Sequence, residues 1–480
     1  MSYPGEQFDA TSRALLAPAD YQNPRPAGRY HLVVVGAGPA GLISAIGASG
    51  LGAKVALIER ASMGGDCLNV GCVPSKALLE YTRSNPQPDF AEAFSWLREV
   101  RAGIAPHDSV ERYTEAGVDV FFGDASFNDA GQICVDQMPL NARRVALCTG
   151  ARADLPPIPG LRESGPLTNE TVFDLIEAPA SLAILGAGAI GCELATVFAR
   201  LGVEVHLFEL APRVLPTEDE QASQMVADAL RDLGIHLHLG QGVTEVRGAE
   251  QFEICAGGET VRTEQLLVAL GRKPNVEDLN LELAGVLTDA RGFIVTDAKL
   301  RTTNSKVYAA GDCTAALQFT HHADAQARAL IQNSLFLPTA KVDSLVVPHC
   351  MYTQPEVASV GAGILELRES GVAFDCYRVE FTELDRGRAE VDGAGFAQVL
   401  TAGGSDRIIG ATIVGHDAGE QLAPICLLMS NGLGLSRAGK ALFAYPTRSE
   451  YLKRLADAYT RSRFTPRVAA LFRTWLGLTG

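Results

Sequence analysis

The 480-residue chain is 47% hydrophobic and 20% charged, so it can bury the cores of two or three domains. Its net charge of −15 argues against nucleic acid as a partner, because phosphate backbones are bound by basic surfaces. Ten cysteines in this length are too few for a disulfide scaffold.

The N-terminal segment has early acids and prolines and no apolar stretch, so it does not resemble a signal peptide. We expect the residues before Pro24 to be a flexible or docking extension. The stretch from Leu32 to Ala53 carries no charge and is long enough to span a bilayer. A β-branched run followed by glycines instead favours a buried strand, a turn and a helix. We expect a cytoplasmic protein, in which a disulfide is more often catalytic than structural.

A dinucleotide fingerprint follows the first predicted strand. In such a fingerprint Gly36 makes the tight turn, Gly38 lets the backbone approach a pyrophosphate, and Gly41 lets the helix pack closely on the strand. The free N–H groups at the helix N-terminus favour phosphate. Glu59 ends the second predicted strand and would accept a hydrogen bond from a ribose hydroxyl.

The fingerprint occurs a second time, with Gly186, Gly188 and Gly191 followed by Glu209 at the same spacing. Two dinucleotide sites in one chain imply two nucleotides, a flavin and a nicotinamide carrier. A carboxylate at Glu209 binds a 2′-hydroxyl and repels a 2′-phosphate, which favours NADH over NADPH. Arg213 lies near in sequence and weakens this preference.

Two cysteines, Cys67 and Cys72, lie in the segment "GGDCLNVGCVPSK". Four intervening residues are a long spacing for one arm of a zinc knuckle, and the sequence shows no second Cys or His pair with ligand spacing, so we expect no metal site. A structural bridge is disfavoured in the cytoplasm. Pro74 and Ser75 suggest that Cys72 begins a helix, which lowers the pKa of a thiol and favours a redox role.

This segment resembles the redox motif of the flavoprotein disulfide reductases, the group that holds dihydrolipoamide dehydrogenase, glutathione reductase and mercuric reductase. The resemblance covers nearly the whole chain and is strongest to the mercuric reductase branch. Further matching motifs are "ALCTG" (Ala146–Gly150), "ALGRKPN" (Ala269–Asn275), "VYAAGDC" (Val307–Cys313) and "YTQPEVASVG" (Tyr352–Gly361).

The resemblance implies an α/β fold with two Rossmann-like dinucleotide-binding domains and a C-terminal α+β dimerisation domain. The division that we expect is an N-terminal extension (1–29), an FAD-binding domain (30–155 and 275–338), an NAD(P)-binding domain (156–274), a dimerisation domain (341–456) and a basic amphipathic C-terminal extension (457–480).

The resemblance also implies roles for residues. NADH reduces the flavin, which opens a Cys67–Cys72 disulfide; Cys72 contacts the isoalloxazine ring, and Cys67 is the exposed thiol that meets substrate. Lys76 would lie near flavin N5, paired with Glu193, since an unpaired buried charge is costly. The remaining implied contacts are Gly65, Ala125, Thr149, Gly150, Gly311 and Asp312 for FAD, with Asp312 on the ribityl chain, and Gly271 for NAD.

Most other cysteines are expected to pack in the core, because they lie in apolar runs. They are Cys134, Cys148, Cys192, Cys255, Cys313, Cys376 and Cys426. Cys350 is expected to pack as well, with a place near the substrate cavity as the alternative. His321 and His322 receive a minor structural role.

The chain departs from the family near its C-terminus. Disulfide-reducing members have a histidine, oriented by a glutamate and supplied by the other subunit, where "YPTRSE" here has Tyr445 and Glu450. Phenol titrates near pH ~10 and imidazole near ~6.5, so Tyr445 is a poor proton acceptor at neutral pH. This argues against glutathione and lipoamide, and mercuric reductases also carry tyrosine here. They end in a vicinal cysteine pair, however, whereas no cysteine follows Cys426.

The segment after residue 456 predicts a basic amphipathic helix. Its apolar face holds Val468, Leu471, Phe472, Trp475 and Leu478, and its arginines are Arg461, Arg463, Arg467 and Arg473. We expect the apolar face to pack on the same dimer, with contact to a membrane surface as the alternative.

Together these features predict a homodimeric, FAD- and NADH-dependent oxidoreductase. Its substrate is expected to react with thiols: a small disulfide, a persulfide or a soft metal ion such as Hg(II). One alternative is a quinone or copper reductase that works directly from flavin. Another is a non-catalytic redox sensor or partner-binding subunit, against which the intact cysteines and fingerprints argue.

Overall fold

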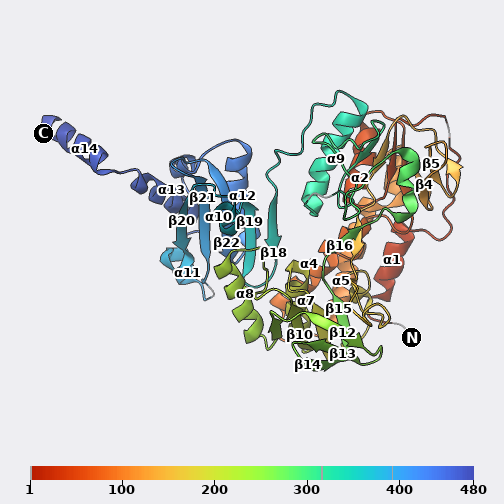
Figure 1. Ribbon diagram of the computed structural model, residues 1–480, viewed down its shortest axis with the longest axis horizontal. Coiled ribbons are helices and arrows are strands. Elements are labelled where there is room, and N and C mark those ends of the chain that lie inside the picture. The colour runs from red at the N-terminus through yellow and green to blue at the C-terminus, as the bar shows by residue number, and fades with distance from the viewer. Residues whose placement is uncertain (1–2, 27, 315–316, 392, 480) are drawn as a thin grey trace. The chain divides into compact units, whose positions relative to one another are not determined.

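The computed structural model describes residues 3–26, 28–314, 317–391 and 393–479. The chain forms two compact units (Figure 1). The first unit comprises Met1–Pro212 and Leu233–Ser344, and the second comprises Arg213–Asp232 and Leu345–Gly480. Within the described residues, no helix has the length and apolar character needed to cross a membrane.

A five-stranded parallel sheet forms the centre of the first unit. Its strands, in spatial order, are β17 (Val307–Ala309), β7 (Val145–Leu147), β1 (Leu32–Val35), β2 (Val55–Glu59) and β3 (Val118–Phe122). Every residue of β1 is buried, as is typical of a parallel strand covered on both faces. Helices α2 (Pro39–Gly50) and α9 (Thr320–Leu335) pack together on one face. The expected strand, turn and helix between Leu32 and Ala53 are therefore confirmed.

The other face of this sheet packs on a small antiparallel sheet of β4 (Ala125–Phe127), β5 (Ile133–Val135) and β6 (Met138–Pro139). An antiparallel ribbon of β8 (Ala151–Ala153) and β16 (Arg272–Pro274) also belongs to this unit. Three further helices are α3 (Gly65–Asn69), α4 (Cys72–Ser84) and α6 (Val110–Glu115).

A second parallel sheet in the first unit repeats the arrangement of strand, glycine turn and helix. Its order is β11 (His236–Leu239), β10 (Glu204–Glu209), β9 (Ser181–Leu185) and β15 (Gln265–Val268). Helix α7 (Ala189–Arg200) packs on β9 and β10. An apolar core joins this sheet to an antiparallel sheet of β12 (Val243–Arg247), β13 (Phe252–Ala256) and β14 (Glu259–Thr263).

The N-terminal extension docks as helix α1 (Glu6–Leu16) on helix α5 (Phe90–Ile104). Asp9 Oδ2 lies 3.2 Å from Arg98 Nε, and Asp9 Oδ1 lies 2.5 Å from Arg101 Nη2. The Arg98 side chain is only 1% exposed, so Asp9 neutralises a buried guanidinium. Of the two alternatives for this extension, the structure shows docking.

The second unit is an antiparallel sheet with helices on it, an α+β arrangement. The strand order is β18 (Pro348–Met351), β19 (Glu356–Gly361), β22 (Ile408–Gly415), β21 (Phe396–Ala402) and β20 (Phe374–Glu380). Its helices include α8 (Glu220–Asp232), α10 (Ile364–Glu369), α11 (Asp385–Ala389), α12 (Ala418–Ser430) and α13 (Glu450–Ser462).

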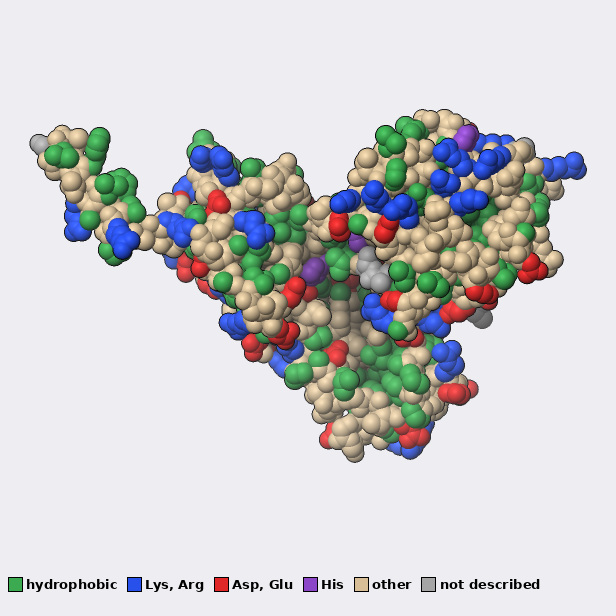
Figure 2. Space-filling model, turned by 45° about the horizontal axis from the view of Figure 1, so that its top comes forward, with side chains coloured by type: hydrophobic (Ala, Val, Ile, Leu, Met, Phe, Trp, Pro, Cys, Tyr) green, Lys and Arg blue, Asp and Glu red, His purple; other side chains and the backbone are tan. Residues whose placement is uncertain are grey.

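The terminal helix α14 (Pro466–Thr479) has no buried residue among those described. Leu471, Trp475 and Leu478 are 69%, 63% and 78% exposed. Figure 2 shows apolar side chains along this helix. In the single chain, the apolar face of the described part of α14 is therefore exposed. Its packing in the dimer stays a prediction.

Core packing is confirmed for four cysteines and wrong for one. Cys134, Cys148, Cys192 and Cys313 are buried. Cys376 is exposed, because it lies on β20, the edge strand of its sheet, at a position where the side chain points outward. Three more cysteines, Cys255, Cys350 and Cys426, are partly buried, and the last two pack against the core of the second unit. His322 is buried with Nδ1 2.8 Å from the Leu317 carbonyl oxygen, which fits a structural role.

Candidate active site

The first glycine turn is crowded in the way that a dinucleotide fingerprint requires. A Cβ on Gly36, whose φ is +100°, would lie 2.4 Å from the Cys148 carbonyl oxygen. A Cβ on Gly41 would lie 1.7 Å from the Gly36 carbonyl oxygen. Helix α2 can therefore pack this closely on the turn after β1 only because residue 41 has no side chain. Glu59 holds the turn, since its carboxylate accepts the N–H groups of Ala37 at 2.8 Å and Ala61 at 2.9 Å.

The second turn reproduces this hydrogen bonding. Glu209 accepts the N–H of Ala187 and the N–H of Ala211, both at 2.9 Å. Gly186 has φ +102°, and its Cβ would lie 2.4 Å from the Ala269 carbonyl oxygen. A Cβ on Gly188 would meet nothing within 4 Å, so the N-terminus of α7 is open to a phosphate group.

The segments predicted to hold FAD converge in the first unit. A Cβ on Gly65 would lie 2.4 Å from the Gly38 Cα, which brings the cysteine segment against the first glycine turn. Arg272 joins three of the segments: it pairs with Asp66, donates to the Ala151 carbonyl at 2.8 Å and lies 3.7 Å from Asp312 Oδ2. This glycine cradle with an acidic side chain behind it fits a dinucleotide such as FAD.

The other residues predicted at the dinucleotide sites lie at turns or in the same unit. Gly311 has φ +79° and donates its N–H to Gln326 Oε1 at 2.7 Å. Burial raises the pKa of the neighbouring Asp312. The Thr149 carbonyl accepts from Asn275 Nδ2 at 3.0 Å. Gly150 and Gly271 also have positive φ, and Ala125 is on β4.

Cys72 is the first residue of helix α4, as expected, and both Cys67 and Cys72 are thiols. The Cys72 sulfur lies 3.5 Å from the Thr320 hydroxyl, at the start of helix α9. A hydrogen bond from the Cys67 thiol lowers the pKa of Cys72, and Thr320 and the Lys76 charge act in the same direction. The same bond, together with burial, raises the pKa of Cys67. When one of the two thiols is deprotonated, the negative charge therefore lies on Cys72.

The two cysteines differ in their surroundings. Cys72 is exposed and Cys67 is half-buried. The reason is local: Cys67 lies within the short helix α3 beside buried Leu68, whereas Cys72 lies at an open helix end. Which of the two sulfurs contacts the isoalloxazine ring and which meets substrate stays a prediction.

The ion pair expected between Lys76 and Glu193 is present. Lys76 Nζ, on α4, donates to Glu193 Oε2, on α7, at 2.7 Å. The Glu193 side chain is only 3% exposed, so its carboxylate has little access to water and depends on such donors. The pair joins the helix that begins with Cys72 to the helix of the second glycine turn.

In the second unit, Tyr445 is held by Asp385. The Tyr445 hydroxyl donates to Asp385 Oδ2 at 2.8 Å, and this bond raises the pKa of the phenol. Glu450, expected to hold Tyr445, instead accepts from Arg454 Nε at 3.0 Å, one helical turn along α13. The expected contact with Glu450 is therefore corrected to Asp385, which comes from α11 and carried no signal in the sequence.

Family comparison agrees with this geometry. Residues 30–327 match the model of the pyridine nucleotide-disulphide oxidoreductases, and residues 347–456 match the dimerisation domain of the same proteins. The chain belongs to this family.

Several relatives cover almost the whole chain. A mercuric reductase of Staphylococcus aureus is 32% identical over 454 residues, which span 90% of this chain and 83% of the relative. Dihydrolipoyl dehydrogenase 3 of Pseudomonas aeruginosa is also 32% identical, spanning 90% of this chain and 98% of the relative. The Cu(II) complex of a mutant of the HOCl-induced flavoprotein disulfide reductase RclA from Escherichia coli has a TM-score of 0.83 at 29% identity, covering 89% of this chain and 99% of that one.

Membership fixes the general chemistry. The protein is an oxidoreductase whose cofactors are FAD and a pyridine nucleotide, and its dimerisation domain indicates a homodimer. Three contacts at the site were missed in the sequence: Thr320, Arg272 and Asp385. Arg272 stands beside Gly271 in "ALGRKPN", a motif that was recognised without this residue being singled out.

Proposed function

We propose that this oxidoreductase passes electrons from NADH to the Cys67–Cys72 pair and on to a thiol-reactive substrate. The substrate class is a small disulfide, a persulfide or a soft metal ion such as Hg(II). The observation that carries the proposal is the position of Cys72 at the start of α4, beside Thr320 and with a lowered pKa. When bound, FAD supplies the relay of an electron pair from the nicotinamide carrier to the cysteines.

The cysteine pair can carry out disulfide reduction with atoms and electrons in balance. In the reduced pair, Cys67 and Cys72 hold two thiol protons and two electrons. Cys67 gives up its thiol proton and attacks one sulfur of the substrate disulfide, and the thiolate that leaves takes up a proton. Cys72 then attacks Cys67, a disulfide closes, and the substrate leaves as two thiols. The low pKa of Cys72 keeps it ready for this second attack.

Tyr445 narrows the substrate class. The released thiolate of an ordinary disulfide needs a proton, and a phenol whose pKa is raised by Asp385 exchanges protons slowly at neutral pH. A soft metal ion or an already acidic leaving thiol needs no such proton. We therefore rank Hg(II), activated disulfides and persulfides above glutathione disulfide and lipoamide, with Tyr445 coming from the partner subunit as in the family.

The preference for NADH rests on Glu209. Its carboxylate is fixed at the end of β10 by two backbone N–H groups, those of Ala187 and Ala211. A fixed negative charge there accepts a ribose 2′-hydroxyl and opposes a 2′-phosphate. Arg213, the cation near Glu209 in sequence that weakens this preference, donates to the Pro216 carbonyl at 2.7 Å.

Copper is a second candidate substrate. Two solved relatives at 29% and 28% identity are Cu(II) complexes of the reductase RclA, one of them a mutant with serine in place of a cysteine. Copper(I) prefers thiolate ligands, which the reduced pair offers.

The proposed function also divides the chain between its two cofactors. Segments 30–155 and 275–338 bind FAD, and segment 156–274 binds the nicotinamide carrier. The cytoplasmic location stays a prediction.

A substrate screen tests the proposal. NADH oxidation is followed with Hg(II), Cu(II), a quinone, glutathione disulfide, lipoamide and an activated aromatic disulfide, in the unaltered enzyme and in Cys72→Ser. Turnover that needs Cys72 supports the proposal. Turnover of Cu(II) or a quinone that survives in Cys72→Ser would replace it with a reductase that works directly from flavin.

A further inference from the structure

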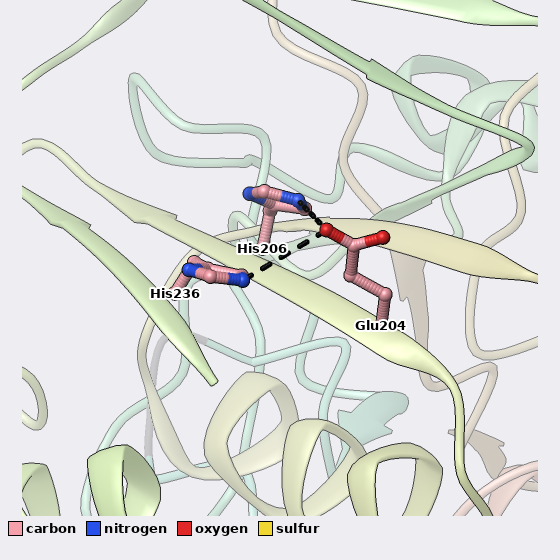
Figure 3. A group of neighbouring side chains, drawn as sticks. All are labelled: Glu204, His206 and His236. Atoms are coloured by element: carbon pink, nitrogen blue, oxygen red, sulfur yellow. Dashed lines mark ion pairs between the residues drawn. The ribbon is translucent and has the colours of Figure 1, made fainter. Parts of the chain in front are cut away.

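Three side chains with metal-binding atoms meet at the edge of the second parallel sheet. Glu204 and His206 are two residues apart on β10, so they project from the same face. His236 lies on the edge strand β11, in register with His206. Figure 3 shows both rings directed toward one oxygen of Glu204. In the part of the chain that the structure describes, this is the one group of three such residues with all ligand atoms within 4.8 Å of one another.

The spacing of the three atoms suits a metal ion. Glu204 Oε1 lies 3.4 Å from His206 Nε2 and 3.8 Å from His236 Nε2. Ligands about 2.1 Å from a tetrahedral zinc ion are separated by about 3.4 Å. The His206 and His236 rings are stacked, with centroids 4.6 Å apart, so the His236 ring must turn out of the stack to direct its lone pair at the same ion. Glu204 and His236 are free to turn, since they are 60% and 56% exposed, and they leave an entry path from solvent.

A fourth side chain orients the central ligand. His206 is only 14% exposed, and its Nδ1 lies 3.2 Å from His238 Nε2. If Nδ1 donates to His238, Nε2 of His206 carries the lone pair and faces Glu204, as metal-bound histidines with a second hydrogen-bond partner do.

The electrostatics also favour a cation. Glu204 supplies the one carboxylate among the three proposed ligands. Glu259, at the start of β14, adds a second negative charge that acts on His238. A divalent ion would balance both acids.

We propose that Glu204, His206 and His236 form a binding site for a divalent late transition metal ion, with Zn(II) as the ion that fits best. Two imidazoles and a carboxylate, with water as the fourth ligand, are a set that zinc accepts, and imidazole also suits Cu(II) and Ni(II). The site is separate from the cysteine pair and from the glycine turns. Glu204 begins β10 and Glu209 ends it, five residues at about 3.3 Å each, so about 17 Å separates the metal from the nicotinamide turn.

The consequence of binding is mechanical. Strand β11 is an edge strand that pairs only with β10 in its sheet. A metal held by His236 and His206 ties this edge strand to its neighbour. Metal binding should therefore raise the thermal stability of the protein, because a ligand that binds only the folded state shifts the unfolding equilibrium.

The test measures Zn(II) binding to the full-length holoenzyme by equilibrium dialysis and by thermal melting. All variants carry Cys67→Ser and Cys72→Ser, so that these thiols do not compete for zinc. We expect one equivalent of Zn(II) per chain and a melting temperature that rises with added zinc. Glu204→Gln and His236→Gln should each weaken binding by about a hundredfold or more and abolish the zinc-dependent rise. His238→Gln should weaken binding by a smaller factor, about tenfold, because it removes only an orienting contact.

The matched control is His107→Gln, which removes an exposed histidine outside the cluster and should leave zinc binding unchanged. Both ligand substitutions are at largely exposed side chains, so folding is expected to survive, and the melting curves without zinc verify this. Equal zinc affinity in Glu204→Gln, His236→Gln and His107→Gln, or no stoichiometric binding to the parent, would overturn the proposal.

Discussion

Replacing Lys76 with methionine should destabilise the first unit by about 2 kcal/mol. Removing one member of a fully buried ion pair costs about 3–5 kcal/mol, because the remaining charge loses its partner in a medium of low dielectric constant. Here the Glu193 carboxylate is 3% exposed, but Lys76 is 36% exposed, so water screens part of the interaction and we expect a cost below this range, about 2 kcal/mol. The expected change is about 30-fold in the unfolding equilibrium constant.

The assay is urea unfolding of the apoprotein, with Lys273→Met as the matched control. Lys273 and Glu277 are also 2.7 Å apart, yet their side chains are 48% and 42% exposed, and Arg152 still pairs with Glu277 after the substitution. We expect the control to cost less than about 0.5 kcal/mol. Adding Glu193→Gln to Lys76→Met should recover part of the loss, since no buried charge remains. If Lys76→Met costs no more than Lys273→Met, the burial argument for this pair is wrong.

Three further predictions concern the reaction itself. Glu209→Ala should narrow the gap in kcat/KM between NADH and NADPH, and equal values in the unaltered enzyme would contradict the argument from its charge. Tyr445→His should raise turnover of glutathione disulfide by up to ~10²-fold, whereas Tyr445→Phe should lower the turnover rate of the preferred substrate. If the unaltered enzyme turns over lipoamide as fast as histidine-bearing relatives do, the argument that Tyr445 limits proton transfer is wrong. Cys67→Ala removes the hydrogen bond that lowers the pKa of Cys72, so the pH midpoint for alkylation of Cys72, followed by mass spectrometry, should rise; an unchanged midpoint would assign the low pKa to the helix end and Lys76.

Sequence reasoning located what depends on local sterics. Four glycines of the two turns must be glycine because a Cβ there would collide with a backbone oxygen; they are Gly36, Gly41, Gly186 and Gly191. Cys72 was placed at a helix start for a similarly local reason. Contacts made by distant residues were out of reach: Asp385 meets Tyr445 across 60 positions, and Asp9 meets Arg98 across 89.

Exposure was the other point at which the sequence misled. Cys376 lies in a mixed segment on an edge strand, where the face it occupies depends on the register with β21, and an apolar neighbour in sequence says little about that face.

The paired carboxylates of the two glycine turns bear on cofactor engineering. Glu209 is the obvious residue to replace in a design that should accept NADPH, but it also accepts two backbone N–H groups of the turn, at 2.9 Å each. Each lost bond costs about 1 kcal/mol, so a switch of coenzyme made at this position would be paid for in thermal tolerance. A designer who keeps Glu209 and adds a cation near the 2′ position would leave the turn intact, and the same reasoning protects Glu59 in the first turn.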